Sequence, residues 1–253
     1  MLLNLSFASV PLRLARQIAA FASQSSKAIW DPTNADAVAA VGELSALNAL
    51  EKMKARMMAD LTGRAILLNQ PLVTDELLAV AERQPGGTFG HRYASYMNHN
   101  KFNPDARTPV TYIADPTLRY IMTRYRQCHD FMHTLTGCGR TVEEELAVKI
   151  LEWRHTGLPL GLLSLIGGGV YLTSAQRQNL KFYWEWGREN APRCIHGEKQ
   201  IPFYLNIDWE EMISKPFDEV VFITGITPLA EYLQKRRDYN ERAGMLNKID
   251  GLV

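Results

Sequence analysis

Cysteine is scarce in this chain. Three cysteines occur, Cys128, Cys138 and Cys194, and they form neither a CxxC pair nor an even disulfide framework. Such usage suits a reducing compartment. Cys128 adjoins a histidine but lies about 100° away around a helix, so we expect it to pack in the core rather than bind a metal.

Excess charge of one sign is also missing. The net charge is +1, and Lys and Arg form no stripe, so the sequence gives no electrostatic case for a nucleic-acid partner. With 253 residues, 46% hydrophobic and 22% charged, the chain is long enough to bury one sizeable core. We expect a single domain over residues 1–253.

No apolar run reaches the roughly 20 residues that span a bilayer, but two segments come near. Residues 157–173 carry no charge, yet Pro159 and the glycines at 167–169 make a poor spanning helix. The segment suits a hydrophobic lid, a groove wall or a membrane-dipping element, and equally a buried helix–turn of the core.

Residues 1–30 contain no Asp or Glu but include Arg13, Arg16 and Lys27, a composition like that of a mitochondrial presequence. Apolar residues nevertheless recur at helical spacing there. We therefore expect a folded, basic amphipathic first helix that lies on a membrane surface.

Helical periodicity dominates the rest of the chain. It predicts one helix from about residue 35 to 68, another over 174–186, and another from about 228 to 247. Strand-like composition is confined to residues 220–223. The predicted class is all-α, a single-domain multi-helix bundle.

The most informative motif is His129-Asp130-Phe131-Met132-His133. Asp115 and Pro116 form a helix start upstream, and Gly137 is a stop signal. On that helix the two histidines lie about 40° apart, and Asp130 falls about 100° from His129, so all three side chains point into one sector.

A second helix should return to this motif. Thr141-x-x-Glu144 is a capping box after a short connection, so the two helices form an αα-hairpin that brings Glu145 back toward the histidines. Two imidazoles with one or two carboxylates suit zinc, with manganese or iron(II) as alternatives, whereas a mainly carboxylate site would favour magnesium.

The predicted metal ligands are therefore His129, His133 and Glu145, with Asp130 either a fourth ligand or an acceptor for an imidazole N–H. The motif does not match that of zinc proteases, which needs Glu as general base where this chain has Asp130.

These residues resemble the signature of the coenzyme Q biosynthesis protein four (Coq-four) family, His-Asp-x-x-His followed after eleven residues by Glu. The resemblance covers about residues 10–215 and leaves 216–253 as a C-terminal helical extension. Glu144 departs from the family pattern, which commonly has Gly there, and the spacing favours Glu145 as the ligand. The other matching segments are Trp30-Asp31-Pro32, Val38-Ala39-x-x-Gly42-Glu43, Pro85-Gly86-Gly87-x-x-Gly90-x-x-Tyr93, Pro104-Asp105-Ala106-Arg107, Arg124-Tyr125-Arg126, Glu145-Leu-Ala-Val-Lys149 and His155-Thr-Gly-Leu-Pro159.

The resemblance implies a role in ubiquinone biosynthesis, peripheral membrane association and organisation of the other Q-synthesis enzymes. It also implies metal-dependent oxidative decarboxylation at ring carbon C1 of a 4-hydroxy-3-methoxy-5-polyprenylbenzoate-type lipid. The alternative is a non-catalytic lipid-binding scaffold that presents prenylated intermediates to partner enzymes; a generic metallohydrolase is a distant third.

Further expectations follow for the site. Arg107 or Arg124 would pair with the substrate carboxylate. Tyr93 and His155 are candidate proton donors or acceptors, and a core or surface role is the favoured alternative for each. Lys149 should form a helix-surface ion pair with Glu145. The apolar stretch after the second metal helix should line a groove for the isoprenoid tail, through Leu162, Leu165 and Ile166.

We also expect a homodimer. The membrane would be the cytoplasmic side of a bacterial inner membrane or the matrix side of the mitochondrial inner membrane.

Overall fold

The computed structural model describes residues 12–31, 34–193 and 201–250. Within these ranges all regular structure is helical, and the sole β-type pairing is an isolated bridge between Thr88 and Pro216. The predicted all-α class is therefore confirmed. The helices in chain order are α1 (Leu12–Trp30), α2 (Ala35–Ser45), α3 (Leu47–Met58), α4 (Leu61–Asn69), α5 (Asp75–Glu82), α6 (Phe89–Asn100), η1 (Pro104–Ala106), α7 (Pro116–Thr136), α8 (Val142–Thr156), α9 (Pro159–Gly169), α10 (Ser174–Glu189), η2 (Tyr204–Asn206), α11 (Trp209–Met212), α12 (Phe217–Thr224) and α13 (Leu229–Asp250).

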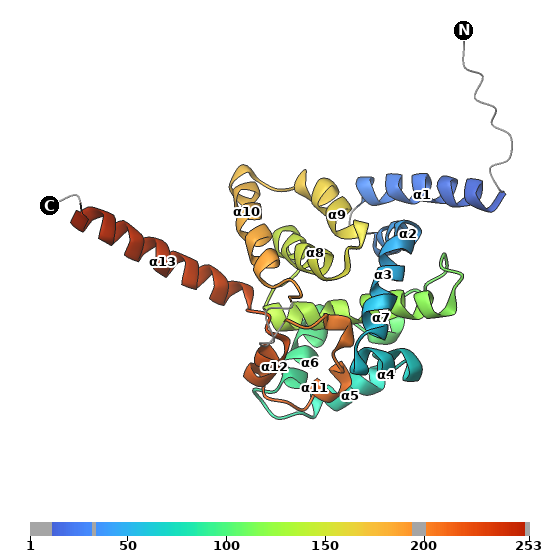
Figure 1. Cartoon of the computed structure of the whole chain (residues 1–253). Helices are drawn as coiled ribbons and strands as arrows, with labels where there is room; N and C mark the ends of the chain where they lie inside the picture. The colour runs from blue at the N-terminus through green and yellow to red at the C-terminus, as the bar shows by residue number, and fades with distance from the viewer. Residues whose placement is uncertain (1–11, 32–33, 194–200, 251–253) are drawn as a thin grey trace, which may run out of the picture.

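Helix α7 runs through the middle of the molecule (Figure 1) and packs against α3, α4, α6, α8 and α12. Its ends are those predicted. The Asp115 carboxylate accepts a hydrogen bond from the Leu118 N–H at 2.8 Å, and Gly137 ends the helix in the left-handed region at φ 70°. The capping box of Thr141 and Glu144 opens α8, as predicted.

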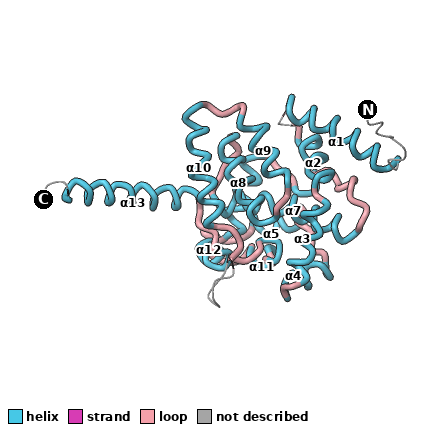
Figure 2. The backbone as a smooth tube through the Cα atoms, turned by 45° about the horizontal axis from the view of Figure 1, so that its top comes forward, coloured by secondary structure: helices cyan, strands magenta, loops and turns pink. Residues whose placement is uncertain are grey.

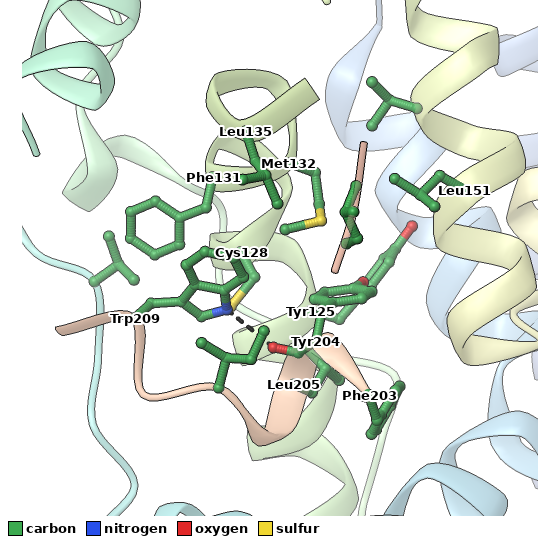
Figure 3. Close-up of a cluster of buried hydrophobic side chains, with 14 of the residues drawn as sticks. Tyr125, Cys128, Phe131, Met132, Leu135, Leu151, Phe203, Tyr204, Leu205 and Trp209 are labelled. Carbon is green, nitrogen blue, oxygen red and sulfur yellow. Dashed lines mark hydrogen bonds between the residues drawn. The ribbon is translucent and has the colours of Figure 1, made fainter. Parts of the chain in front are cut away.

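The core gathers around α7 (Figure 3). Aromatic and sulfur-containing side chains of this helix meet the segment that follows α10 in the chain, where the Trp209 indole N–H donates to the Tyr204 carbonyl at 3.0 Å. Phe131 stacks on Trp209 with ring centroids 5.3 Å apart. Cys128 is fully buried in this cluster, so its predicted packing role is confirmed. Cys194 lies outside the described residues.

The single helix predicted over residues 35–68 is wrong, because the structure has three helices there. Asp60 adopts an extended conformation and caps α4 by accepting from the Gly63 N–H at 2.8 Å. Ala46, between α2 and α3, is fully buried. Helical periodicity continues through such breaks, since each short helix turns its own apolar face to the same core.

The strand suggested at residues 220–223 is also wrong. These residues lie in α12, where the buried positions Phe217, Val220 and Thr224 follow helical spacing, and Gly225 ends the helix at φ 65°. A short apolar run does not by itself distinguish a strand from a buried helix segment.

Helix α9 lies beside α8 and α2 at the edge of the molecule where α1 also lies (Figure 1). Its close approach to α8 depends on Gly161, where an added Cβ would stand 2.6 Å from Cβ of Trp153 and 2.7 Å from the Lys149 carbonyl oxygen. Helix α13 instead projects away from the body (Figure 2). In the described part of the chain, no helix combines the length and apolarity needed to cross a membrane.

Candidate metal centre

Helices α7 and α8 bring three ligand-type side chains together. Nε2 of His129 lies 3.1 Å from Nε2 of His133. The Glu145 carboxylate completes the group, with one oxygen 3.6 Å from His129 Nε2 and the other 3.4 Å from His133 Nε2. One ligand atom from each residue can be chosen so that all lie within 4.8 Å of one another. The predicted hairpin therefore forms and delivers Glu145 to the histidines.

The outer nitrogen of each imidazole already has a partner. Nδ1 of His129 lies 2.8 Å from Oε1 of Glu152, and Nδ1 of His133 donates to the Cys138 carbonyl at 3.0 Å. Both partners are acceptors, so each Nδ1 carries a proton, and in the neutral imidazole each Nε2 lone pair faces the centre. Metal-binding histidines have this arrangement, in which a hydrogen bond on the outer nitrogen sets the tautomer.

Burial differs sharply among the three side chains. His133 is fully buried, with the Tyr96 ring stacked on it at 5.3 Å between centroids, whereas the Glu145 side chain is 33% exposed. The cluster thus opens toward solvent on the Glu145 side. A metal held here by two imidazoles and one carboxylate would keep that side for water or a substrate oxygen.

The charges around the cluster favour the ionised form of Glu145 and the protonated form of His129. Burial opposes ionisation of Glu145, but hydrogen bonds from His129 and His133 outweigh it and hold the pKa of Glu145 well below its ordinary range. For His129, burial and Lys149 lower the pKa, yet Glu152 and Glu145 together raise it to about 9. A dication would replace the proton that these carboxylates attract.

Glu152 was missed by the sequence reasoning. Its side chain is 1% exposed and accepts hydrogen bonds from His129, Tyr125 and Lys149. A signal did exist, because Glu152 follows Glu145 by seven residues and so lies on the same face of α8. The predicted ion pair between Lys149 and Glu145 is wrong, since Lys149 bonds Glu152 at 2.8 Å instead.

Asp130 points to a different partner. Its carboxylate, 4% exposed, forms an ion pair with the guanidinium of Arg107. Among the described residues, Asp130 does not belong to the group of possible metal ligands formed by His129, His133 and Glu145. Burial opposes the charge of Arg107, but Asp130 raises the pKa of Arg107 above its ordinary value. The structure therefore gives the acid within the motif a role in fixing the loop that precedes α7.

The other residues considered for chemistry lie apart from the cluster or in the core. Arg124 is fully buried and donates to the Ile207 carbonyl at 2.8 Å while pairing with Glu210. His155 is buried, donates to the Asn190 carbonyl at 2.9 Å, and has its pKa lowered to about 3 by burial. Both side chains stabilise the fold.

Tyr93 lies in the core near Asp130. Its ring packs on Phe131 with centroids 4.6 Å apart, and its buried hydroxyl makes no hydrogen bond. Burial and the charge of Asp130 raise the pKa of Tyr93 far above its ordinary value. A neutral phenol is therefore what this position provides.

The residues predicted to line a tail groove lie on α9. Leu162 and Ile166 are exposed, at 36% and 73%, while Leu165 is half-buried against the core. Val170 and Tyr171, just beyond the helix, are exposed as well. The uncharged stretch is thus only partly buried.

Comparison with known proteins gives one consistent result. The family described as coenzyme Q (ubiquinone) biosynthesis protein Coq4 matches residues 8–230. A ubiquinone biosynthesis protein COQ4 homolog of Trypanosoma cruzi, named mitochondrial, is 55% identical over 88% of each chain. The corresponding Leishmania major protein is 59% identical over 74% of this chain and 100% of its own.

A solved structure supports the fold. The crystal structure of a putative ubiquinone biosynthesis protein from Nostoc punctiforme superimposes with a TM-score of 0.60, at 17% identity, over 84% of this chain and 97% of that one. The family match and the relatives from T. cruzi and L. major confirm the resemblance found in the sequence. The chain belongs to the coenzyme Q (ubiquinone) biosynthesis protein Coq4 family.

Proposed function

We propose that this protein acts in ubiquinone biosynthesis as a metal-dependent decarboxylase, removing the C1 carboxyl group of a polyprenylated 4-hydroxybenzoate. The observation that carries the proposal is the convergence of His129 Nε2, His133 Nε2 and the partly exposed Glu145 carboxylate. Three protein ligands with an open side are typical of catalytic rather than structural metal sites.

The donor set fits zinc best, with iron(II) and manganese as the alternatives. When bound, such an ion supplies a Lewis acid for the carboxylate or phenolate oxygen of the substrate. Arg107 would orient the carboxylate of the substrate. Its side chain is 31% exposed and keeps donors available beyond its bond to Asp130.

The overall reaction must balance. The bond between C1 and the carboxyl carbon breaks, carbon dioxide leaves, and C1 gains a hydroxyl group. This is a two-electron oxidation of the ring, and we assign dioxygen as the oxidant: water supplies the new hydroxyl oxygen, and dioxygen takes up the two electrons and two protons and leaves as hydrogen peroxide.

We further propose peripheral attachment to the inner mitochondrial membrane on its matrix side, in company with other ubiquinone-synthesis enzymes. The support is twofold. The relatives from T. cruzi and L. major are named mitochondrial, and α9 presents Leu162, Leu163 and Ile166 to solvent. Burying those side chains in lipid would contribute about 25 cal/mol per Å² of apolar surface.

Turnover tests the proposal. Purified protein would be loaded with zinc, iron(II) or manganese and given a short-chain 4-hydroxy-3-methoxy-5-prenylbenzoate in air, and carbon dioxide and the hydroxylated product would be measured. We expect product with wild type and none with His133→Ala. Absence of product with every metal, despite bound substrate, would contradict the decarboxylase.

A non-catalytic lipid-binding scaffold is the second candidate. It is favoured by the fact that Arg107 and Arg124 both already pair with protein carboxylates. In that case the same experiment would give stoichiometric substrate binding without turnover.

A further inference from the structure

The carboxylate of Glu152 stands at the junction of three polar groups. Its Oε1 lies 2.8 Å from Nδ1 of His129, while Oε2 accepts from the Tyr125 hydroxyl at 2.9 Å and from Lys149 Nζ at 2.8 Å. Glu152 therefore accepts from three donors in a buried position. One oxygen is kept for the histidine alone.

The neighbouring ammonium creates a competition for His129. Lys149 Nζ lies 3.3 Å from His129 Nδ1, and an ammonium group can only donate. If Lys149 donated to Nδ1, the neutral ring would carry its proton on Nε2, the atom that faces His133 and Glu145. A protonated Nε2 has no lone pair for a metal ion.

The two histidines differ in this respect. His133 receives its tautomer from the Cys138 carbonyl, a backbone group that no side-chain change removes. The tautomer of His129 depends instead on the side chain of Glu152, and the adjacent Lys149 favours the tautomer with the proton on Nε2. The metal centre thus has one ligand fixed by the backbone and one fixed by Glu152.

We propose that Glu152 is a positioning residue that selects the metal-binding tautomer of His129 against the adjacent Lys149, an inference that rests on the proposed metal centre. By binding Lys149 through Oε2, Glu152 diverts the ammonium from the imidazole. By accepting at Oε1, it holds the proton on Nδ1.

Glu152→Gln tests this directly. The donor-only Lys149 attracts the amide oxygen, which turns the amide NH₂ toward His129 Nδ1 and forces the proton onto Nε2. We expect zinc affinity to fall by about 10- to 100-fold, the usual size of the effect when the hydrogen-bond partner of a metal-bound histidine is lost. Glu143→Gln, which removes a carboxylate bonded to Tyr183 and Asn179 of α10, is the matched control and should leave affinity unchanged.

A second substitution separates tautomer selection from a general structural role. In Glu152→Gln/Lys149→Met the amide is free to turn its oxygen to Nδ1, so zinc affinity should recover most of the loss. Nitrogen-15 NMR of labelled histidine in the metal-free protein, at a pH where the ring is neutral, should report Nδ1–H in wild type, Nε2–H in Glu152→Gln, and Nδ1–H again in the double variant.

The possible results distinguish the role of Glu152 from the existence of the metal centre. Wild-type affinity and Nδ1–H in Glu152→Gln would overturn the inference while leaving the metal centre in place, and so would a double variant that recovers neither. Should Glu152→Gln not fold, comparing the double variant with Glu152→Leu/Lys149→Met gives the same test, because only the first keeps an acceptor for Nδ1. Failure of wild type to bind zinc, iron(II) or manganese would overturn the proposed function itself.

Discussion

Nε2 of His129 lies 3.1 Å from Nε2 of His133, one helical turn further along α7, with the two rings nearly perpendicular at 88°. Both nitrogens also face the carboxylate of Glu145 on α8. Two lone pairs would repel at this distance unless a proton or a cation lay between them.

Glu145 and the adjacent Glu144 should behave differently. Glu145→Gln removes the only carboxylate of the cluster, so zinc affinity should fall by at least about tenfold. Glu144 serves the capping box with Thr141, a position that Gln also fills, so Glu144→Gln should change neither zinc affinity nor stability appreciably. Titration calorimetry of both variants checks this, and the reverse order would show that the wrong carboxylate was assigned.

Metal binding should depend on pH. Without metal, Glu152 and Glu145 overcome burial and Lys149 and raise the pKa of His129 from 6.5 to about 9. A metal must displace that proton, so apparent affinity should increase by up to about tenfold per pH unit toward pH 9 and then level off.

The stability of the metal-free protein has the opposite pH dependence and falls as the pH rises. Because the folded pKa of His129 is raised, its contribution to stability is fully present below pH 6.5 and is lost as the pH rises through about 9. The pH dependence of metal affinity is measured by zinc titrations from pH 6 to 10. An affinity independent of pH below 9 would contradict the raised pKa of His129.

Much of this site could be predicted from the sequence. Caps and stop signals are local, so Asp115, Gly137 and Thr141 gave the ends of α7 and the start of α8, and helical spacing then placed the histidines opposite Glu145. The partner of Asp130 could not be predicted this way. Arg107 lies in a loop whose path is set by distant groups, among them Glu43, which accepts from the Thr111 and Tyr112 N–H groups at 2.9 Å.

Arg124 illustrates the same limit. The sequence offered it as a substrate-binding cation, but the fold buries it against carbonyl groups of residues 205 and 207. Those acceptors are about eighty positions away along the chain, so no local pattern indicates them. Glu152, in contrast, was within reach of local reasoning, because the spacing of seven from Glu145 places both on one helical face.

Gly161 should be necessary for the packing of α9 on α8. In Gly161→Ala the new methyl group would clash with Trp153 and the Lys149 carbonyl, so we expect a loss of about 1–3 kcal/mol in the free energy of unfolding. Gly167→Ala is the control, because nothing lies within 4 Å of an added Cβ there, and it should stabilise α9 by up to about 1 kcal/mol. Urea denaturation of both variants is the test; equal stabilities would mean that the two helices are not tightly packed.

The exposed face of α9 should govern membrane attachment. Ile166→Glu places a charge where an apolar side chain is 73% exposed, so liposome binding and lipid copurification should fall severalfold while zinc binding is retained. Leu68→Glu on α4, at the opposite side of the molecule in Figure 1, changes an apolar side chain that is 83% exposed and should have no effect. If both variants bind liposomes as wild type does, another surface makes the contact.

The metal content of the purified protein tests the central claim most directly. Elemental mass spectrometry of wild type, His129→Ala and His133→Ala should be combined with circular dichroism, since the apolar faces of α7 and α8 keep the hairpin folded without either imidazole. The account predicts about one divalent ion per wild-type chain and almost none in the variants, at unchanged helical content. Metal at wild-type stoichiometry in both folded variants would contradict it.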